Sequence, residues 1–338
     1  MDERLPVFSQ FSQRQSYFFE NKRMKFLDLF AGIGGFRLGM ESAGHECIGF
    51  CEIDKFARAS YRAIHNTKGE IELHDITAVS DEFVRGIGRV DIICGGFPCQ
   101  AFSIAGARRG FEDTRGTLFF EIARFASILK PKYLFLENVK GLLNHDKGNT
   151  FETILSALDE LGYDVEWQVL NSKNFGVPQN RERVFIIGHS RRYRSRFLFP
   201  LSGESQSTSS QSVVKIGNVN PSGNGMNGEV YQADGLAPTL TTNKGEGVKI
   251  IQRAHGYNQG GEHDIAPTLT RNSYQENNYL SDGFRIRKLT PRECWRLQGF
   301  PDWAFDKAQE VNSNSQLYKQ AGNSVTVSVI AAIAKELK

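Results

Sequence analysis

Short apolar runs alternate with amphipathic stretches through the first 190 residues of the chain. The runs are four to seven residues long, a length typical of strands that are buried on both faces. The expected strands span residues 24–30, 46–51, 90–94, 133–136 and 184–188. The expected helices cover residues 36–41, a stretch from about 55, residues 117–129, and two further stretches between 139 and 179 that flank another strand. This alternation predicts an α/β fold with a doubly wound, mostly parallel sheet.

The pattern changes at about residue 197. Residues 201–283 are rich in Ser, Gly, Asn and Thr, and residues 235–243 are echoed 29 positions later by 264–272. Spaced Ile, Val, Leu and Tyr residues favour a small β-rich domain over disorder. We therefore divide the chain into an N-terminal tail (1–23), an α/β domain (24–196), a β-rich domain (197–283) and a return to the α/β domain (284–338). In that last part Pro291 suits the first turn of a helix, and the final apolar helix would pack on the first domain.

Composition excludes some classes and leaves others open. The net charge of +3, from 41 Lys and Arg against 38 Asp and Glu, neither requires nor excludes a nucleic-acid partner. The five cysteines show no zinc-site or CxxC spacing, which predicts reduced thiols and no metal. No apolar stretch has the length of a membrane span, and the polar, charged N-terminus is unlike a signal peptide. These features predict a cytoplasmic protein.

Cys99 is a candidate nucleophile. It follows the apolar run 90–94 and the pair Gly95-Gly96, which places it just beyond the carboxyl end of a strand. Ligands bind at this edge of open α/β sheets. A lone cysteine is more often a buried structural thiol, so its surroundings must decide.

A glycine-rich turn joins the first strand to the first helix. Gly32, Gly34 and Gly35 would let a ligand approach the backbone at the start of that helix, although their spacing differs from GxGxxG. Glu52 lies 20 residues past Gly32, where such folds place an acid that binds ribose hydroxyls; the alternative is that it caps the next helix. Asp75, at another strand end, could bind an adenine amino group, but taken alone it is better explained as a turn residue.

Five motifs occur together in one order. On these motifs the chain resembles the bacterial DNA (cytosine-5)-methyltransferases of restriction-modification systems, over about residues 24–190 and 285–338. The motifs are Asp28-Leu29-Phe30-Ala31-Gly32-x-Gly34-Gly35, Gly96-Phe97-Pro98-Cys99-Gln100, Glu137-Asn138-Val139, Gln179-x-Arg181-x-Arg183 and Gly322-Asn323-Ser324-Val325. Each motif alone could arise by chance, but the ordered set of five is specific.

The resemblance implies a mechanism for methyl transfer from S-adenosylmethionine to C5 of cytosine. Cys99 would add to C6 of the ring. Glu137, with a raised pKa in a closed pocket, would hydrogen-bond to N3 and the exocyclic amine. Arg183 would stabilise charge at the ring carbonyl, with Arg181 orienting Glu137 or acting beside it. The target base must leave the duplex, because C6 is unreachable inside it.

The resemblance also implies a cofactor site and a Rossmann-like fold. Phe30 and the glycine turn would face the methionine end, Glu52 the ribose and Asp75 the adenine. Ile53 stands where many relatives have an aromatic residue, which would reduce stacking on the adenine. The implied cofactor-binding set is Phe30, Gly32, Gly34, Gly35, Glu52, Ile53, Asp75, Pro98, Leu118 and Asn323.

The DNA contacts that the resemblance implies lie on two segments. The loop 101–116 would close over the flipped base, and residues 197–283 would read the sequence as a target-recognition domain. A Thr-Leu pair of this domain would help to hold the target strand; Thr268-Leu269 fits the usual placement, but the choice between it and Thr239-Leu240 stays open. The implied DNA-binding set is Gln100, Ser103, Arg108, Arg109, Arg115, Thr268 and Leu269, with Arg191–Arg196 and Arg285–Arg292 as further phosphate contacts.

Two other functions remain open. One is an RNA (tRNA) cytosine-5 methyltransferase of the same fold, although the chain lacks the Cys-Phe-Thr signature of those relatives. The other is a non-catalytic DNA-binding protein. The favoured interpretation is a monomeric enzyme that acts on double-stranded DNA, with a restriction endonuclease as a possible partner at the same site.

Overall fold

The computed structural model describes residues 23–98, 118–203 and 286–338, together with short segments between 215 and 281. Seven strands form one sheet in the order β3-β2-β1-β4-β5-β8-β6. All neighbouring pairs are parallel except those that involve β8, which runs antiparallel to β5 and β6. The strands are β1 (Lys25–Leu29), β2 (Glu46–Cys51), β3 (Ile71–Leu73), β4 (Ile92–Gly96), β5 (Tyr133–Val139), β6 (Tyr163–Asn171) and β8 (Glu182–Ser190). The predicted mostly parallel α/β sheet is therefore confirmed.

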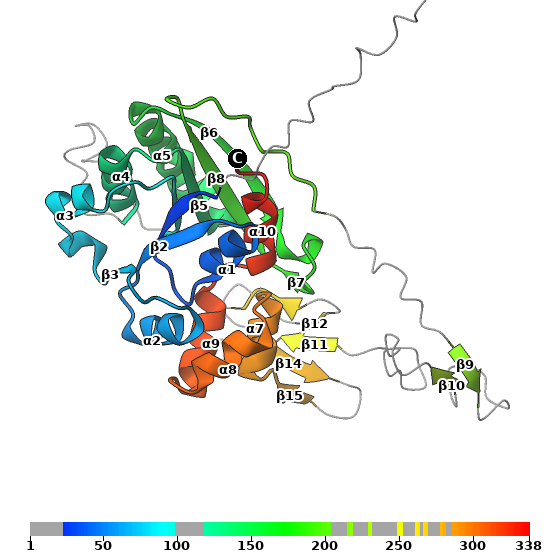
Figure 1. Ribbon diagram of the computed structural model, residues 1–338. Helices are drawn as coiled ribbons and strands as arrows, with labels where there is room; N and C mark the ends of the chain where they lie inside the picture. The colour runs from blue at the N-terminus through cyan, green and yellow to red at the C-terminus, as the bar shows by residue number, and fades with distance from the viewer. Residues whose placement is uncertain are drawn as a thin grey trace, which may run out of the picture.

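The alternating side chains of the sheet serve two apolar layers. In β5, Leu134 and Leu136 face one layer, whereas Tyr133 and Phe135 face the other. Successive side chains of a strand point to opposite faces, so a strand covered on both sides must be apolar throughout. Helices therefore lie on both faces (Figure 1). One layer contains α3 (Asp81–Gly86), α4 (Leu118–Leu129) and α5 (Asn149–Glu160), and the other contains α1 (Gly35–Ser42) and α10 (Val327–Ala334).

The C-terminal segment returns to this core, as its apolar sequence predicts. Helix α10 packs on α1 so closely that a Cβ at Gly39 would lie 2.6 Å from Cβ of Ile330. The preceding helices form a third apolar cluster around the buried Trp295. They are α7 (Pro291–Leu297), α8 (Asp302–Gln309) and α9 (Asn314–Asn323). Pro291 opens α7 as expected, behind a capping box of Thr290 and Glu293.

Helix α2 (Lys55–Ile64) joins this third cluster to the sheet. Its Ile64 lies in the cluster, and its Ser60 donates a hydrogen bond to Gln320 of α9. The N-cap of α2 is Asp54, whose carboxylate accepts from the amides of Phe56 and Ala57. The proposed alternative role of Glu52 as a helix cap is therefore wrong, because Asp54 already fills that position.

Two local expectations differ from the structure. The segment before residue 179 was expected to contain a second helix, but after β6 the chain forms only the 3₁₀ turn η3 (Ser172–Asn174) and the short strand β7 (Gln179–Asn180). The strand expected at 133–136 extends to Val139, because β8 pairs with it along its whole length. Glu137 therefore lies inside a strand and not beyond its end. Two more 3₁₀ helices are η1 (Ile76–Ala78) and η2 (Lys140–Gly148).

The segment between 215 and 288 contains short antiparallel strands in its described parts. Strands β12-β11-β14-β15 form one sheet, β9 pairs with β10, and β13 pairs in parallel with β7 of the larger domain. The sheet continues past residue 283, because β15 pairs with β14. The bounds are β9 (Lys215–Asn218), β10 (Glu229–Tyr231), β11 (Lys249–Gln252), β12 (Gly261–His263), β13 (Ala266–Pro267), β14 (Asn278–Ser281) and β15 (Ile286–Lys288). The division of the chain into domains stays a prediction.

Candidate active site

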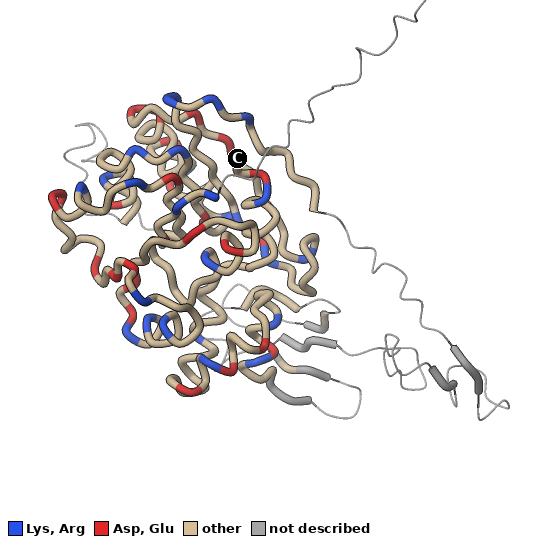
Figure 2. The backbone as a smooth tube through the Cα atoms, in the orientation of Figure 1, with Lys and Arg blue, Asp and Glu red and all other residues tan. Residues whose placement is uncertain are grey.

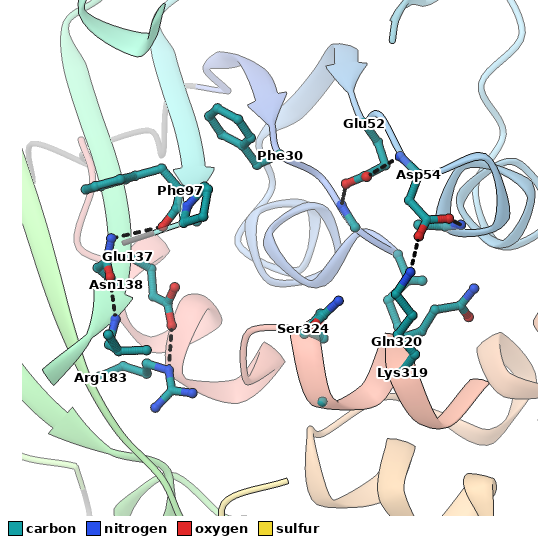
Figure 3. Close-up of a pocket in the computed structure, with 18 of the residues that line it drawn as sticks. Phe30, Glu52, Asp54, Phe97, Glu137, Asn138, Arg183, Lys319, Gln320 and Ser324 are labelled. Carbon is teal, nitrogen blue, oxygen red and sulfur yellow. Dashed lines mark hydrogen bonds and ion pairs between the residues drawn. The ribbon is translucent and has the colours of Figure 1, made fainter. Parts of the chain in front are cut away.

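A cavity of about 440 Å³ lies at the carboxyl edge of the parallel strands, the edge at which α/β folds bind ligands. Its walls come from the ends of β1, β2, β4 and β5 and from the C-terminal end of α9 (Figure 3). Volumes of about 300–1,000 Å³ are usual for small-molecule sites. The lining residues are Phe30, Gly32, Ile33, Glu52, Asp54, Ala57, Gly96, Phe97, Pro98, Glu137, Asn138, Val139, Arg181, Arg183, Lys319, Gln320, Gly322, Asn323 and Ser324.

The turn after β1 brings backbone to the cavity. Phe30 has a φ of 56°, which is unusual for a bulky residue, and strained backbone of this kind clusters at functional sites. Gly32 also has a positive φ, and a Cβ there would meet no atom within 4 Å. Gly34 and Gly35 differ, because a Cβ would lie 2.1 Å from His65 Nε2 at Gly34 and 2.8 Å from Val325 at Gly35. Gly32 thus leaves its backbone open to a ligand, whereas the other two glycines are required by internal packing.

Glu52 is held by backbone amides. Its Oε2 accepts a hydrogen bond from the amide of Gly32 at 2.7 Å, and its Oε1 accepts from the amide of Asp54 at 2.7 Å. A carboxylate has about four acceptor positions, so each oxygen can accept one bond more. Burial raises the pKa of Glu52, and the two amides act against this shift. The result is a fixed acceptor at the wall of the cavity.

Glu137 lies at the opposite wall. It is directly across from Gly96 in the β4–β5 pair, where a Cβ would lie only 3.2 Å from the Glu137 carboxylate. Burial raises the pKa of Glu137, against the charges of Arg183 and Arg181, which lower it. The direction agrees with the sequence prediction for a proton-holding carboxyl.

Arg183 pairs with Glu137, and strand register explains why. Arg183 lies opposite Val139 in the β5–β8 pair, and Glu137 is two residues from Val139 on the same face of β5. The Arg183 Nε and the Glu137 Oε1 are 3.1 Å apart (Figure 3). The Arg183 guanidinium thus faces the Glu137 carboxylate, and both residues line the cavity.

Arg181 has a different environment. It is 3% exposed and donates hydrogen bonds to three backbone carbonyls, those of Leu269, Gly322 and Ser324. Burial, together with the nearby charge of Arg183, lowers the pKa of Arg181 to about 9. In the structure Arg183, and not Arg181, contacts Glu137. Arg181 instead lines the cavity and joins its own segment to Leu269 and to the end of α9.

Asn138 fixes the backbone that precedes Cys99. Its Nδ2 donates a hydrogen bond to the carbonyl of Phe97 at 2.9 Å, and its Oδ1 accepts from the amide of Val139. The end of β4 is therefore tied to β5 one residue before Pro98, which lines the cavity. Cys99 itself lies outside the described residues.

Comparison with known proteins identifies the family of the chain. Residues 24–338 match the model of the C-5 cytosine-specific DNA methylase family. The chain belongs to this family. Type II methyltransferase M.HpaII of Haemophilus parainfluenzae is 41% identical over 94% of this chain and 89% of its own. Type II methyltransferase M.HhaI of Haemophilus parahaemolyticus is 36% identical over 92% and 93%. The orphan methyltransferase M.SPRI of Bacillus phage SPR is 35% identical over 93% and 97%.

Solved structures share the fold. The crystal structure of a DNA modification methyltransferase encoded within an E. coli prophage superposes with a TM-score of 0.61 at 20% identity, covering 93% of this chain and 98% of its own. DNMT2 of Spodoptera frugiperda gives a TM-score of 0.60 at 19% identity, covering 91% and 97%. The predicted family, fold and enzyme class are thus confirmed: the chain is a DNA cytosine-5 methyltransferase.

Eight residues predicted from the sequence line the cavity of this methyltransferase. They are Phe30, Gly32, Glu52, Pro98, Glu137, Arg181, Arg183 and Asn323. They come from six separate segments of the chain, so the fold brings together residues that the motifs place up to 293 positions apart. Their individual roles are proposals.

Five predicted cofactor contacts do not line the cavity. Besides Gly34 and Gly35, Ile53 is 69% exposed, and Leu118 packs against the core of the α3–α5 layer. The Asp75 carboxylate accepts hydrogen bonds from the amide and the hydroxyl of Thr77, as a turn residue does. Contacts of these residues with a cofactor stay predictions.

The predicted DNA contacts divide into two groups. Gln100, Ser103, Arg108, Arg109 and Arg115 lie outside the described residues, as does Thr239-Leu240. Of the other copy, the Thr268 hydroxyl donates to the carbonyl of Asn180, and Leu269 is buried at 1% exposure against the C-terminal helices. In this structure the pair docks the small domain on β7.

Charged residues of both signs are interspersed over the described chain (Figure 2). Arg191 pairs with Asp159 and Asp164, and Arg196 pairs with Glu336. These carboxylates offset the charge that the sequence analysis assigned to phosphate contacts. Within the described residues, no helix has the length and apolar character needed to cross a membrane, and no three His, Cys, Asp or Glu side chains group as metal ligands.

Sequence reasoning missed several residues of the cavity. Asp54 and Lys319 form an ion pair at its wall, and Gln320 and Asn138 also line it. Lys319 precedes Asn323 by four positions on α9, which places both on one helix face. That spacing was the available signal for Lys319.

Proposed function

We propose that this methyltransferase modifies C5 of cytosine within a short specific DNA sequence, with S-adenosylmethionine as methyl donor and Cys99 as covalent nucleophile. The observation that carries the proposal is one cavity with two different carboxylates: Glu137 beside a guanidinium, and Glu52 between backbone amides. Enzymes of this family depend on S-adenosylmethionine generally. The Glu137 wall would bind the cytosine, and the Glu52 wall would bind the methyl donor.

The residues present fit the cofactor. Glu52 has free acceptor positions for the two ribose hydroxyls, and the open backbone at Gly32 leaves room for the methionine end. Asn323 also lines the cavity. S-adenosylmethionine, when bound, would supply an electrophilic methyl group to the base.

The chemistry then follows from this chain's own groups. The Cys99 thiolate adds to C6 of the flipped cytosine, and the electron pair of the C5–C6 double bond becomes available at C5. The Glu137 carboxyl donates its proton toward N3, while the Arg183 guanidinium hydrogen-bonds to the ring carbonyl oxygen. C5 takes the methyl group as the donor's carbon–sulfur bond breaks, which leaves S-adenosylhomocysteine. C5 then loses its proton to a base, the C6–sulfur bond breaks to release the Cys99 thiolate, and N3 returns its proton to Glu137. The raised pKa of Glu137 suits it to hold the proton that this step needs.

The biological setting is part of the same proposal. We infer a monomer that acts on double-stranded DNA and protects sites against a cognate restriction endonuclease. Its relatives include both type II methyltransferases and an orphan methyltransferase, so membership of the family does not by itself imply a partner endonuclease.

The test is expression of the whole chain in a bacterial host without DNA methylation, followed by base-resolution sequencing of 5-methylcytosine. We expect methylation confined to one short motif, and none from a Cys99→Ser variant that still binds DNA. Unmodified DNA with a folded, cofactor-binding protein would overturn the proposal and favour an RNA substrate. Motif-specific methylation by Cys99→Ser would overturn the role of Cys99.

A further inference from the structure

Lys319 and Asp54 form an ion pair at the wall of the cavity, on the side of Glu52. The ammonium of Lys319 on α9 lies 2.5 Å from Oδ2 of Asp54, and both side chains line the cavity (Figure 3). The two residues are 265 positions apart in the chain. Lys319 stands one turn before Asn323, and Asp54 stands two residues after Glu52. The ion pair therefore joins the two segments that carry the proposed cofactor contacts.

Asp54 transmits this contact to Glu52. Its Oδ1 caps α2 through the amides of Phe56 and Ala57, and its own amide donates to Oε1 of Glu52 at 2.7 Å. Burial works to raise the pKa of Asp54, but Lys319 and the two capping amides outweigh it and lower the pKa below its usual value. Asp54 is thus ionised and held at three points, and its position sets one of the two hydrogen bonds that orient Glu52.

The same two helices are also joined by neutral hydrogen bonds. Gln320 donates to the carbonyl of Phe56 and accepts from the hydroxyl of Ser60, and Asn312 donates to Ser60. These bonds hold α9 and the residues just before it on α2, and none of them involves Asp54 or Glu52. The ion pair acts where the helices meet the cavity, so its loss would loosen the site without separating the helices.

We propose that Lys319 is a positioning residue for the cofactor, which acts through its ion pair with Asp54 to hold Glu52 and Asn323 in their binding arrangement. The inference rests on the proposed cofactor role of this side of the cavity. It assigns no contact between Lys319 and the cofactor. The rival role for the ammonium is a direct ion pair with the carboxylate of the methionine end.

Calorimetry with two ligands separates these roles. S-adenosylhomocysteine has the amino-acid end, whereas 5′-methylthioadenosine lacks it and keeps the ribose. Lys319→Met keeps the aliphatic stem and removes the charge, and Asp54→Asn removes the charge but keeps a good helix cap. Each variant should weaken both ligands by about two- to fivefold, the range of a partly exposed ion pair. The double variant should bind each ligand with the same affinity as the weaker-binding single variant. Lys319→Arg should bind both ligands like the wild type.

The same titrations need a control variant, and they can contradict the proposal. Arg296→Gln breaks the exposed ion pair of Arg296 with Asp302 in the same C-terminal segment and should leave both affinities unchanged. Additive effects of Lys319→Met and Asp54→Asn, or unchanged affinities, would overturn the proposal. A loss confined to S-adenosylhomocysteine would replace it by direct carboxylate binding. A folded wild-type protein that binds neither ligand would overturn the proposed cofactor site as well, which distinguishes the two failures.

Discussion

Glu52 and Glu137 are two carboxylates of one cavity with different partners. Both are largely buried, and burial raises the pKa of each. Glu52 accepts hydrogen bonds from backbone amides, whereas Glu137 faces the side chain of Arg183. Backbone amides are fixed by the fold and cannot take up a proton, so the Glu52 side is built to hold a ligand in one geometry. On the Glu137 side the carboxyl itself can hold or release a proton, and the Arg183 guanidinium lies beside it.

The same contrast extends to the cations behind each carboxylate. Lys319 acts on Glu52 only through Asp54, while Arg183 contacts Glu137 directly. Arg181 lines the cavity and lowers the pKa of Glu137 through its charge, but it donates its hydrogen bonds to the carbonyls of Leu269 and Ser324. We therefore expect substitutions of Glu137 or Arg183 to change turnover, and substitutions of Glu52 to change the affinity for the cofactor.

Substitution of Glu137 should have the largest effect on the rate of methylation. Glu137→Gln keeps the shape but cannot donate the proton toward N3, so single-turnover methylation should slow by about 10²- to 10⁴-fold. The affinity for S-adenosylhomocysteine, measured by calorimetry, should stay unchanged. A variant that retains the wild-type rate would exclude Glu137 as the proton donor.

Arg183→Met should have the next largest effect. Loss of a preorganised donor to the ring carbonyl should reduce the single-turnover rate by about 10²- to 10³-fold. The pH profile should also move. The rate falls as pH rises through the pKa of Glu137, because the proton is lost; Arg183 lowers that pKa, so its removal should shift the alkaline decline to higher pH. An alkaline decline that moves to lower pH, or stays in place, would contradict the pairing.

Much of this site is predictable from sequence because the apolar run of each strand stops close to the cavity, although β5 itself continues to Val139. Apolar runs that stop at Gly32, Glu52, Gly96 or Glu137 place those residues at one sheet edge, and the motifs give their chemistry. The reversal of β8 was not predictable, because a strand's direction depends on partners far away in the chain. The buried run of β8 has the same pattern in either direction.

The roles of residues that depend on packing against distant segments also could not be predicted from the sequence. Gly34 fits the ligand-turn pattern, yet its missing side chain makes room for His65, and that of Gly35 for Val325. Asp54 and Lys319 carry no signal of pairing at 265 residues' separation. The segment 266–269 (Ala-Pro-Thr-Leu) is too short to show a periodic pattern, so its docking on β7 could not be foreseen.

Glu52→Gln should have the smallest effect of the three and the opposite signature. A neutral amide weakens the acceptor for ribose hydroxyls, and its NH₂ group would face the amide N–H of Gly32 or of Asp54. Charge-assisted hydrogen bonds contribute about 1.5–3 kcal/mol, so the affinity for S-adenosylhomocysteine should fall by about 10- to 100-fold in calorimetry. The single-turnover rate at saturating cofactor should change little, because Glu137 and Arg183 are untouched. Glu46→Gln, on the same strand in an exposed pair with Arg23, is the matched control and should alter neither quantity. If Glu52→Gln instead lowered the saturated rate as much as Glu137→Gln, the two walls would not differ in function, and the division between a holding side and a reacting side would be wrong.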